Sequence, residues 1–109
     1  MEGISATLLS LCLAVNVSCN NIEVSFDDLE RNVESEIILY NSGRIAIFVD
    51  DDIRLESSRV KEVLVYELTR VDMHRNSENI KGSRFKSRCM KLAKKADIGL
   101  LSSYDLCSS

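Results

Sequence analysis

The sequence predicts a single α+β domain, in which a β-hairpin packs on a central helix and a basic helix lies behind it. Two short apolar runs on either side of an Asn-Ser-Gly-Arg turn predict the hairpin, and two longer segments with helical periodicity predict the helices. A chain of 109 residues, 45% of them hydrophobic, has room for one modest core and for no second independent domain. We therefore treat residues 1–109 as one domain.

The amino-terminal segment, residues 4–17, is strongly apolar. Its apolar side chains at i, i+4, i+7 and i+11 share one helical face, which indicates a first buried helix beginning at Ile4. The same stretch resembles the apolar part of a secretory signal, although no Lys or Arg precedes it, so residues 1–18 are either a signal-like segment or a first helix. The longest apolar stretch, of 12 residues, is too short to be a transmembrane segment.

A further helix and then the hairpin are expected after this segment. The helix begins at Ser25, whose hydroxyl is a plausible N-cap for the acidic first turn, and ends near Ser35. The hairpin pairs residues 36–40 with residues 45–49 across a turn in which Asn and Gly supply positive φ angles. Three aspartates, residues 50–52, then end the second strand. We interpret them as a solvated turn, because no further acids follow at the spacing of a calcium loop.

Two strongly helical segments follow the hairpin. Five aliphatic side chains of residues 56–75 fall within a sector of about 140°, the pattern of a helix that packs on a core. Residues 83–96 form a second amphipathic helix, capped by Ser83, that buries its apolar residues and turns its lysines outward. Residues 98–101 are expected to form a short buried strand or turn.

Charge is unevenly distributed along the chain. Residues 1–67 have a net charge of −8 and residues 68–109 one of +5, which predicts that the two halves attract each other. The basic helix holds seven bases and no acid between Lys81 and Lys95, so one interpretation is a module that binds RNA, the ribosome or an acidic surface. The candidate anion-binding residues are Lys86, Lys91, Lys94 and Lys95.

The cysteines and the one histidine limit the possible metal and redox chemistry. Cys12, Cys19, Cys89 and Cys107 contain no C-x-x-C pair. We expect mainly free, partly buried thiols, with one or two disulfides if the compartment is oxidising. Because His74 is the only histidine, catalytic zinc centres with two or three histidines are excluded.

Three polar side chains of the 56–75 helix lie in or beside its apolar sector. Glu67 and His74 project into the sector, and Arg70 lies just outside its border. One interpretation is structural, with an i,i+3 ion pair between Glu67 and Arg70 and a satisfied imidazole at the edge of the core. The other is that these residues descend from a catalytic helix.

The second interpretation follows from a resemblance. Residues 63–74, VLVYELTRVDMH, are similar to the helix V-V-x-H-E-L-I-H-A-Y-D-H of the mitochondrial inner-membrane metalloprotease family that processes and assembles an ATP synthase subunit. Residues 43–53 resemble the strand that precedes this helix, G-x-I-V-L-C followed by Q-N-x-I. Cys89 and Cys107 are similar to the cysteines of that family's A-C-x-E-I-R-A segment and of the region beyond it.

Matched residue by residue, Glu67 falls on the general-base glutamate of that family and His74 on its final histidine. Tyr66 and Arg70 stand at the two zinc-binding histidines, and arginine does not ligate metals. The resemblance therefore implies a zincin-like pseudoprotease with a vestigial general base, Glu67, and vestigial metal positions at Tyr66, Arg70 and His74. A salt bridge from Arg70 to Glu67 would replace the missing cation.

The resemblance also implies a biological role. It implies an assembly or interaction factor with a protein partner and a mitochondrial location, whereas residues 4–17 suggest a secretory route. No cofactor is expected, and zinc would be bound only if the pseudoenzyme interpretation is wrong. An active chain would be a zinc metalloendopeptidase.

A second resemblance implies a nuclease. Residues 84–106 are similar to the carboxy-terminal F-x-x-x-A-x-x-L-A-x-x-x-x-I-x-L-L-x-x-x-x-L of Mrr-type restriction-endonuclease folds. It implies Asp51 or Asp52, together with Glu67, as metal-binding carboxylates. Thr69 stands at the position of the expected lysine, so this hydrolytic site would also be defective.

Overall fold

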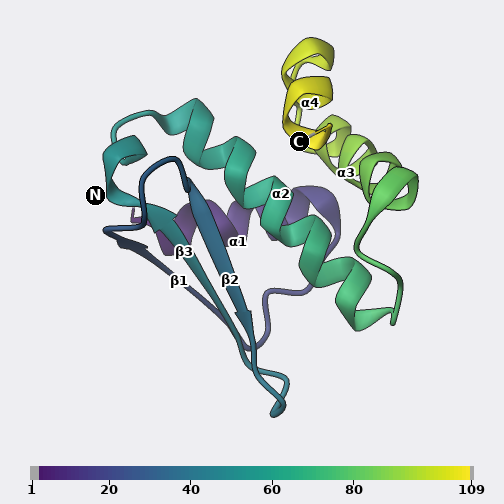
Figure 1. Cartoon of the computed structure of the whole chain (residues 1–109), viewed down its shortest axis with the longest axis horizontal. Coiled ribbons are helices and arrows are strands. Elements are labelled where there is room, and N and C mark those ends of the chain that lie inside the picture. Colours follow the sequence, from purple (N-terminus) through teal and green to yellow (C-terminus); the bar gives the residue numbers. More distant parts are fainter. Residues whose placement is uncertain (1–2, 109) are drawn as a thin grey trace.

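The structure, a computed structural model that describes residues 3–108, is a small β-sheet covered by helices (Figure 1). The strands are β1 (Ile22–Asp27), β2 (Ser35–Leu39) and β3 (Ile45–Asp50). The helices are α1 (Ile4–Val15), α2 (Ser57–Arg75), α3 (Gly82–Lys95) and α4 (Leu100–Cys107), and a 3-10 helix, η1 (Asp51–Ile53), follows β3. The α+β class predicted from the sequence is confirmed.

The sheet has the strand order β1-β3-β2, so β3 is the central strand. β2 and β3 form the predicted antiparallel hairpin, with Ile37 opposite Ile47 and Gly43 at a φ of 91° in the turn. β1 pairs with β3 in parallel. Ile45, Ile47 and Val49 of β3 belong to the main core with residues of α1 and α2, so the helices cover one face of the sheet.

The helix expected from Ser25 to Ser35 is wrong. Residues 22–27 form β1, and Ser35 begins β2. Every second side chain of β1, from Ile22 to Phe26, is half-buried and the others are exposed, which is the two-residue period of a strand. The aspartates that suggested a helix start instead end the strand, where the backbone N–H of Asp28 donates to the Asp27 carboxylate.

The first helix expected in residues 4–17 is α1. It contributes Leu8, Leu11 and Val15 to the core. It ends where Asn16 adopts a positive φ of 61°, a conformation that stops a helix. Across residues 3–108, no helix is both long enough and apolar enough to cross a membrane.

The predicted central helix is α2, which lies across the sheet (Figure 1). Its predicted aliphatic sector is buried, and Val65, Thr69 and Met73 on its other sides are fully buried as well. Met73 packs in a second apolar cluster with Phe85 of α3 and Leu106 of α4. Because the sheet covers one side of α2 and α3 and α4 cover another, α2 is enclosed on nearly all sides.

The predicted basic helix is α3, and its apolar residues are buried as expected. Ser83 does not cap it, since the helix begins at Gly82 and Lys81 occupies the N-cap without a side-chain hydrogen bond. The short buried strand or turn expected at residues 98–101 is wrong, because α4 begins at Leu100, and Leu100 and Leu101 are exposed. A helix of eight residues is marginal by itself, so α4 depends on its packing against α3.

The expectation of mainly free thiols is also wrong. Within the described chain all four cysteines form disulfides, Cys12–Cys19 and Cys89–Cys107. The first links the end of α1 to the segment before β1, and the second links α3 to α4. Sequence spacing gave no sign of the second pair, because Cys107 reaches Cys89 only when α4 folds back along α3.

Replacing Cys89 and Cys107 by alanine is expected to lower the free energy of unfolding by about 3 kcal/mol, because this disulfide closes a loop with a sequence separation of 18. The matched variant, Cys12→Ala/Cys19→Ala, opens a loop with a separation of 7 and is expected to lose about 2 kcal/mol. Urea denaturation of the natural sequence and both variants measures these values. A larger loss for the Cys12/Cys19 variant would contradict the prediction.

Candidate functional site

Glu67 lies within α2 and is only 1% exposed. Its Oε2 atom accepts a hydrogen bond from the hydroxyl of Ser35, the first residue of β2, at 2.7 Å. Its Oε1 atom accepts one from a guanidinium N–H of Arg70 at 3.1 Å. The ion pair predicted between Glu67 and Arg70 is therefore confirmed. The contact from Ser35 was not predicted, because Ser35 was expected to end a helix.

The electrostatics of Glu67 are dominated by its burial. Loss of hydration raises the pKa of the Glu67 carboxyl above its ordinary value. The Ser35 hydrogen bond and the charge of Arg70 oppose this change without cancelling it. Because the Arg70 side chain is 36% exposed, water screens its attraction for the carboxylate.

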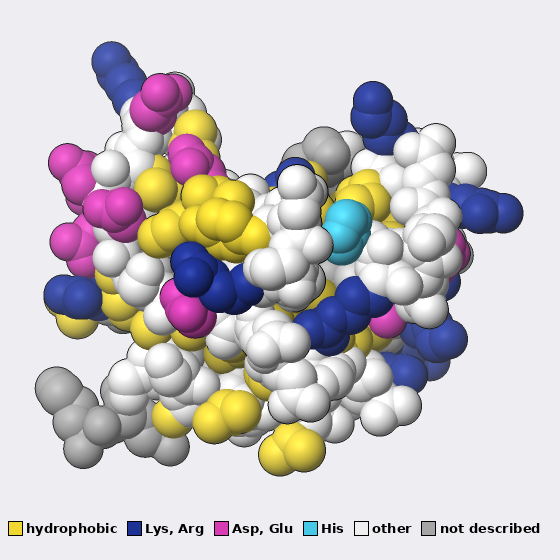
Figure 2. Space-filling model, turned by 90° about the horizontal axis from the view of Figure 1, so that it is seen from below, with side chains coloured by type: hydrophobic (Ala, Val, Ile, Leu, Met, Phe, Trp, Pro, Cys, Tyr) yellow, Lys and Arg dark blue, Asp and Glu magenta, His cyan; other side chains and the backbone are white. Residues whose placement is uncertain are grey.

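His74 does not have the position expected for it. It was predicted to be a satisfied imidazole at the edge of the core, but it is exposed and is visible in cyan in Figure 2. It lies in the last turn of α2, where a helical wheel still assigns it to the inner sector. That turn extends beyond the sheet (Figure 1), and the His74 side chain is exposed there.

Tyr66 and Arg70, at two of the positions that the resemblance relates to metal ligands, are engaged in other contacts. The Arg70 guanidinium carries no lone pair for a metal and is paired with Glu67. The Tyr66 ring packs edge to face on Phe85, with 5.0 Å between the ring centroids. Among residues 3–108, no group of three or more His, Cys, Asp or Glu side chains is arranged to hold a metal ion.

Asp51 and Asp52, the aspartates that the nuclease interpretation names beside Glu67, lie on η1. Asp51 and Asp52 are exposed, and Asp51 pairs with Arg54 at 3.4 Å. Thr69, at the position of the expected lysine, is buried, and its hydroxyl donates to the Val65 carbonyl at 2.9 Å. This side chain is therefore engaged within its own helix.

The solvated turn expected at residues 50–52 is wrong for Asp50. This residue is buried, and its Oδ1 atom accepts a hydrogen bond from the backbone N–H of Leu29 at 3.1 Å. The carboxylate thereby holds the loop between β1 and β2 against the end of β3. The loop that it holds was expected to be helical, so this partner was not predictable.

The candidate anion-binding lysines separate into two groups. Lys86 is half-buried, with its ammonium 4.1 Å from the centroid of the Tyr104 ring. Lys91, Lys94 and Lys95 are exposed farther along α3. Lys86 thus belongs to a different surface from the other three.

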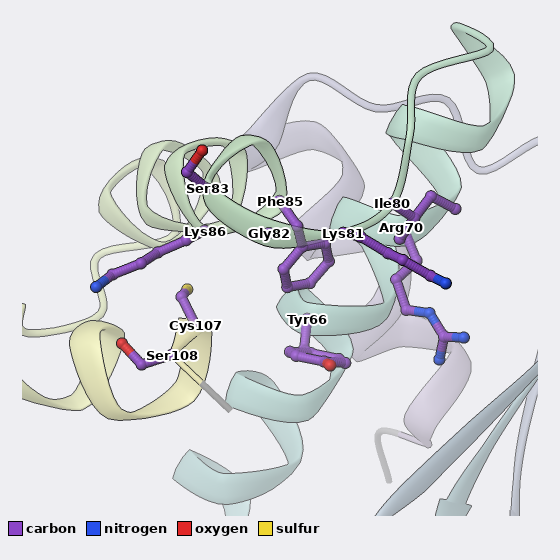
Figure 3. Close-up of a pocket in the computed structure, with 10 residues that line it drawn as sticks. All are labelled: Tyr66, Arg70, Ile80, Lys81, Gly82, Ser83, Phe85, Lys86, Cys107 and Ser108. Carbon is purple, nitrogen blue, oxygen red and sulfur yellow. The ribbon is translucent and has the colours of Figure 1, made fainter.

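A cavity of about 850 Å³ adjoins the Glu67–Arg70 pair and lies between α2, the start of α3 and the end of α4 (Figure 3). Tyr66 and Arg70 line it from α2, and Lys86 lines it from α3. Sequence reasoning missed this cavity, because α4 reaches it only through the packing and the disulfide that join it to α3.

The geometry thus offers a buried, paired carboxylate beside a cavity with cationic side chains. No family model, no curated protein and no solved structure matches this chain.

Replacing Glu67 by glutamine is expected to remove a pH dependence from folding stability. Because the folded pKa is raised, the contribution of Glu67 is complete below its unfolded pKa of about 4.3 and is lost as the pH rises through the folded pKa. The free energy of unfolding of the natural chain should therefore fall, relative to that of Glu67→Gln, as the pH rises from about 4.3 through the raised pKa of Glu67.

Urea denaturation across this pH range measures the difference, and Glu30→Gln, which removes an exposed carboxylate, is the matched control. A difference that rises with pH, or one reproduced by Glu30→Gln, would contradict the assignment.

Proposed function

We propose that the protein is a catalytically inactive, zincin-like relative of the ATP-synthase-assembly metalloproteases and acts as an assembly or interaction factor. The observation that carries this proposal is the state of Glu67. Its carboxylate is buried, and each oxygen has a partner on the protein, Ser35 for one and Arg70 for the other.

A general base in metal-assisted hydrolysis must reach the proton of a metal-bound water. A raised pKa by itself does not make Glu67 such a base, because the carboxylate has no exposed edge to accept that proton. The side chains at the neighbouring vestigial positions, Tyr66 and Arg70, form ring and ion-pair contacts instead of offering metal ligands. The helix thus supports a structural role for residues that the resemblance relates to catalysis.

The surface of the protein supports a binding role. Leu100, Leu101 and Tyr104 of α4 are 76%, 83% and 53% exposed. Single apolar residues on a surface need no explanation, but three large ones on a helix of eight residues favour contact with another protein. Disulfide Cys89–Cys107 fixes the helix that presents them.

The two disulfides also favour one kind of cellular compartment. Two disulfides in a chain of this size support an oxidising compartment, because cytosolic thiols are kept reduced. This is compatible with the mitochondrial location and with the secretory route.

The proposal predicts that the natural chain retains no zinc and cleaves no protein. The purified full chain is incubated with zinc and dialysed, after which bound zinc is measured by atomic emission and cleavage of casein by gel electrophoresis. The variant Tyr66→His/Arg70→His is expected to retain zinc, because two imidazoles on successive helical turns supply two ligands where arginine supplies none.

Circular dichroism establishes that the variant folds. If it does not, the natural chain and Glu67→Gln decide the question. Stoichiometric zinc in the natural chain, with casein cleavage that Glu67→Gln abolishes, would contradict the proposal.

A further inference from the structure

The cavity between α2, α3 and α4 combines an apolar wall with cationic ends. Tyr66, Phe85 and Ile80 form the wall, and the two rings meet edge to face. In Figure 3 the side chains of Arg70 and Lys81 extend towards one end of the cavity, and Lys86 extends towards the other. Its volume of about 850 Å³ lies within the range of protein ligand pockets.

The cations of this cavity are not neutralised by neighbouring acids. Arg70 gives one N–H group to Glu67, whereas Lys81 and Lys86 have no ion-pair partner among residues 3–108. Within the same described range, no acidic side chain lines the cavity. Its walls therefore present three positive charges, of which the buried Glu67 compensates part of one.

Two arginines outside the cavity differ in this respect. Arg59 pairs with Glu34 and Glu62, and Arg88 pairs with Asp72 and Glu78. Figure 2 shows most acidic side chains on the face in view gathered at one side of the molecule. The cavity thus places positive charge beside an apolar surface, and no acidic side chain of residues 3–108 lines it.

We propose that this cavity binds an acidic peptide segment of a partner protein. Carboxylates of the segment would pair with Arg70 and Lys81 at one end and with Lys86 at the other, and an apolar side chain of the segment would pack against the half-buried Tyr66 and Ile80. This inference rests on the proposed function, because it names the kind of partner that an interaction factor of this fold recognises.

The cavity favours a peptide over a nucleic acid for two reasons. Base stacking needs exposed ring faces, whereas Phe85 is only 7% exposed and Tyr66 is packed against it. A polyanion also needs an extended basic surface, but Lys91, Lys94 and Lys95 lie outside this cavity, and the whole chain has a net charge of −3. A short acidic segment needs neither exposed ring faces nor an extended basic surface.

The test uses a fluorescein-labelled peptide in which Leu-Phe is flanked on both sides by Glu-Asp, and a control peptide with Gln-Asn in their place. Fluorescence anisotropy with the full chain measures binding at low and high salt. Lys81→Gln/Lys86→Gln removes two cavity cations that have no ion-pair partner among residues 3–108, and circular dichroism establishes that this variant folds. Lys91→Gln/Lys95→Gln removes the same charge from α3 outside the cavity.

The cavity variant is expected to bind the acidic peptide about tenfold more weakly, and the control variant less than about twofold. The proposal is overturned if the acidic peptide does not bind, if the amide peptide binds equally well, or if both variants lose the same affinity. Tighter binding of oligouridine or of phosphatidylserine vesicles, lost in the control variant, overturns it in favour of the exposed α3 lysines.

The two proposals fail separately. A chain that binds no acidic peptide but also retains no zinc and cleaves no casein overturns the cavity proposal alone. Zinc-dependent cleavage of casein overturns the proposed function, whatever the peptide measurement shows.

Discussion

The enclosure of α2 is the constraint on which the rest of the structure depends, because a helix buried on nearly all sides must satisfy every polar group that it carries inward. Two consecutive residues, Glu34 just before β2 and Ser35 at its start, contact polar side chains of α2. Glu34 pairs with Arg59 in the first turns of the helix, and the hydroxyl of Ser35 donates to Glu67 near its middle. The Arg59 guanidinium holds the pKa of Glu34 below its usual range, whereas burial raises that of Glu67. The contact with Arg59 therefore stabilises the charged carboxylate of Glu34. The hydrogen bond from Ser35 offsets part of the cost of burying the carboxylate of Glu67.

The same enclosure separates the two sides of the candidate site. Glu67 faces inward and has its contacts with the sheet and with its own helix. Tyr66 and Arg70 face the space between α2, α3 and α4. The Glu67 carboxylate is closed off from solvent, whereas Tyr66 and Arg70 border an open cavity, and Arg70 also reaches inward to Glu67. Packing around α2 thus determines both the burial of Glu67 and the placement of Tyr66 and Arg70 at the cavity.

The sequence predicted those elements whose pattern is local. The hairpin follows from its turn, and α2 and α3 from their periodicity, because neighbouring residues decide each of them. β1 was missed because its strand character depends on parallel pairing with β3, about twenty residues away, and its aspartates mimic a helix start. The Glu67–Arg70 pair was predictable because i,i+3 side chains meet on any helix. Ser35 was not, since its hydroxyl reaches Glu67 across the interface of helix and sheet. His74 shows the converse error, because a helical wheel describes a side chain's direction and not whether another element extends far enough to cover it.

Arg70 pairs with the buried Glu67 and also lines the cavity. An arginine suits a position with both of these contacts. A guanidinium has five N–H donors in a plane, so it can donate to Glu67 and still present donors to a second carboxylate, whereas a lysine would offer one compact charge. Ser35 keeps the other oxygen of Glu67 occupied, so a ligand that draws on Arg70 does not leave the buried carboxylate without a partner. Zinc and arginine thus place positive charge beside a glutamate in chemically different ways. A metal ion activates water as a Lewis acid, whereas a guanidinium that stays protonated can only attract and orient an anion. A helix with Arg70 at this position is therefore suited to recognising carboxylates.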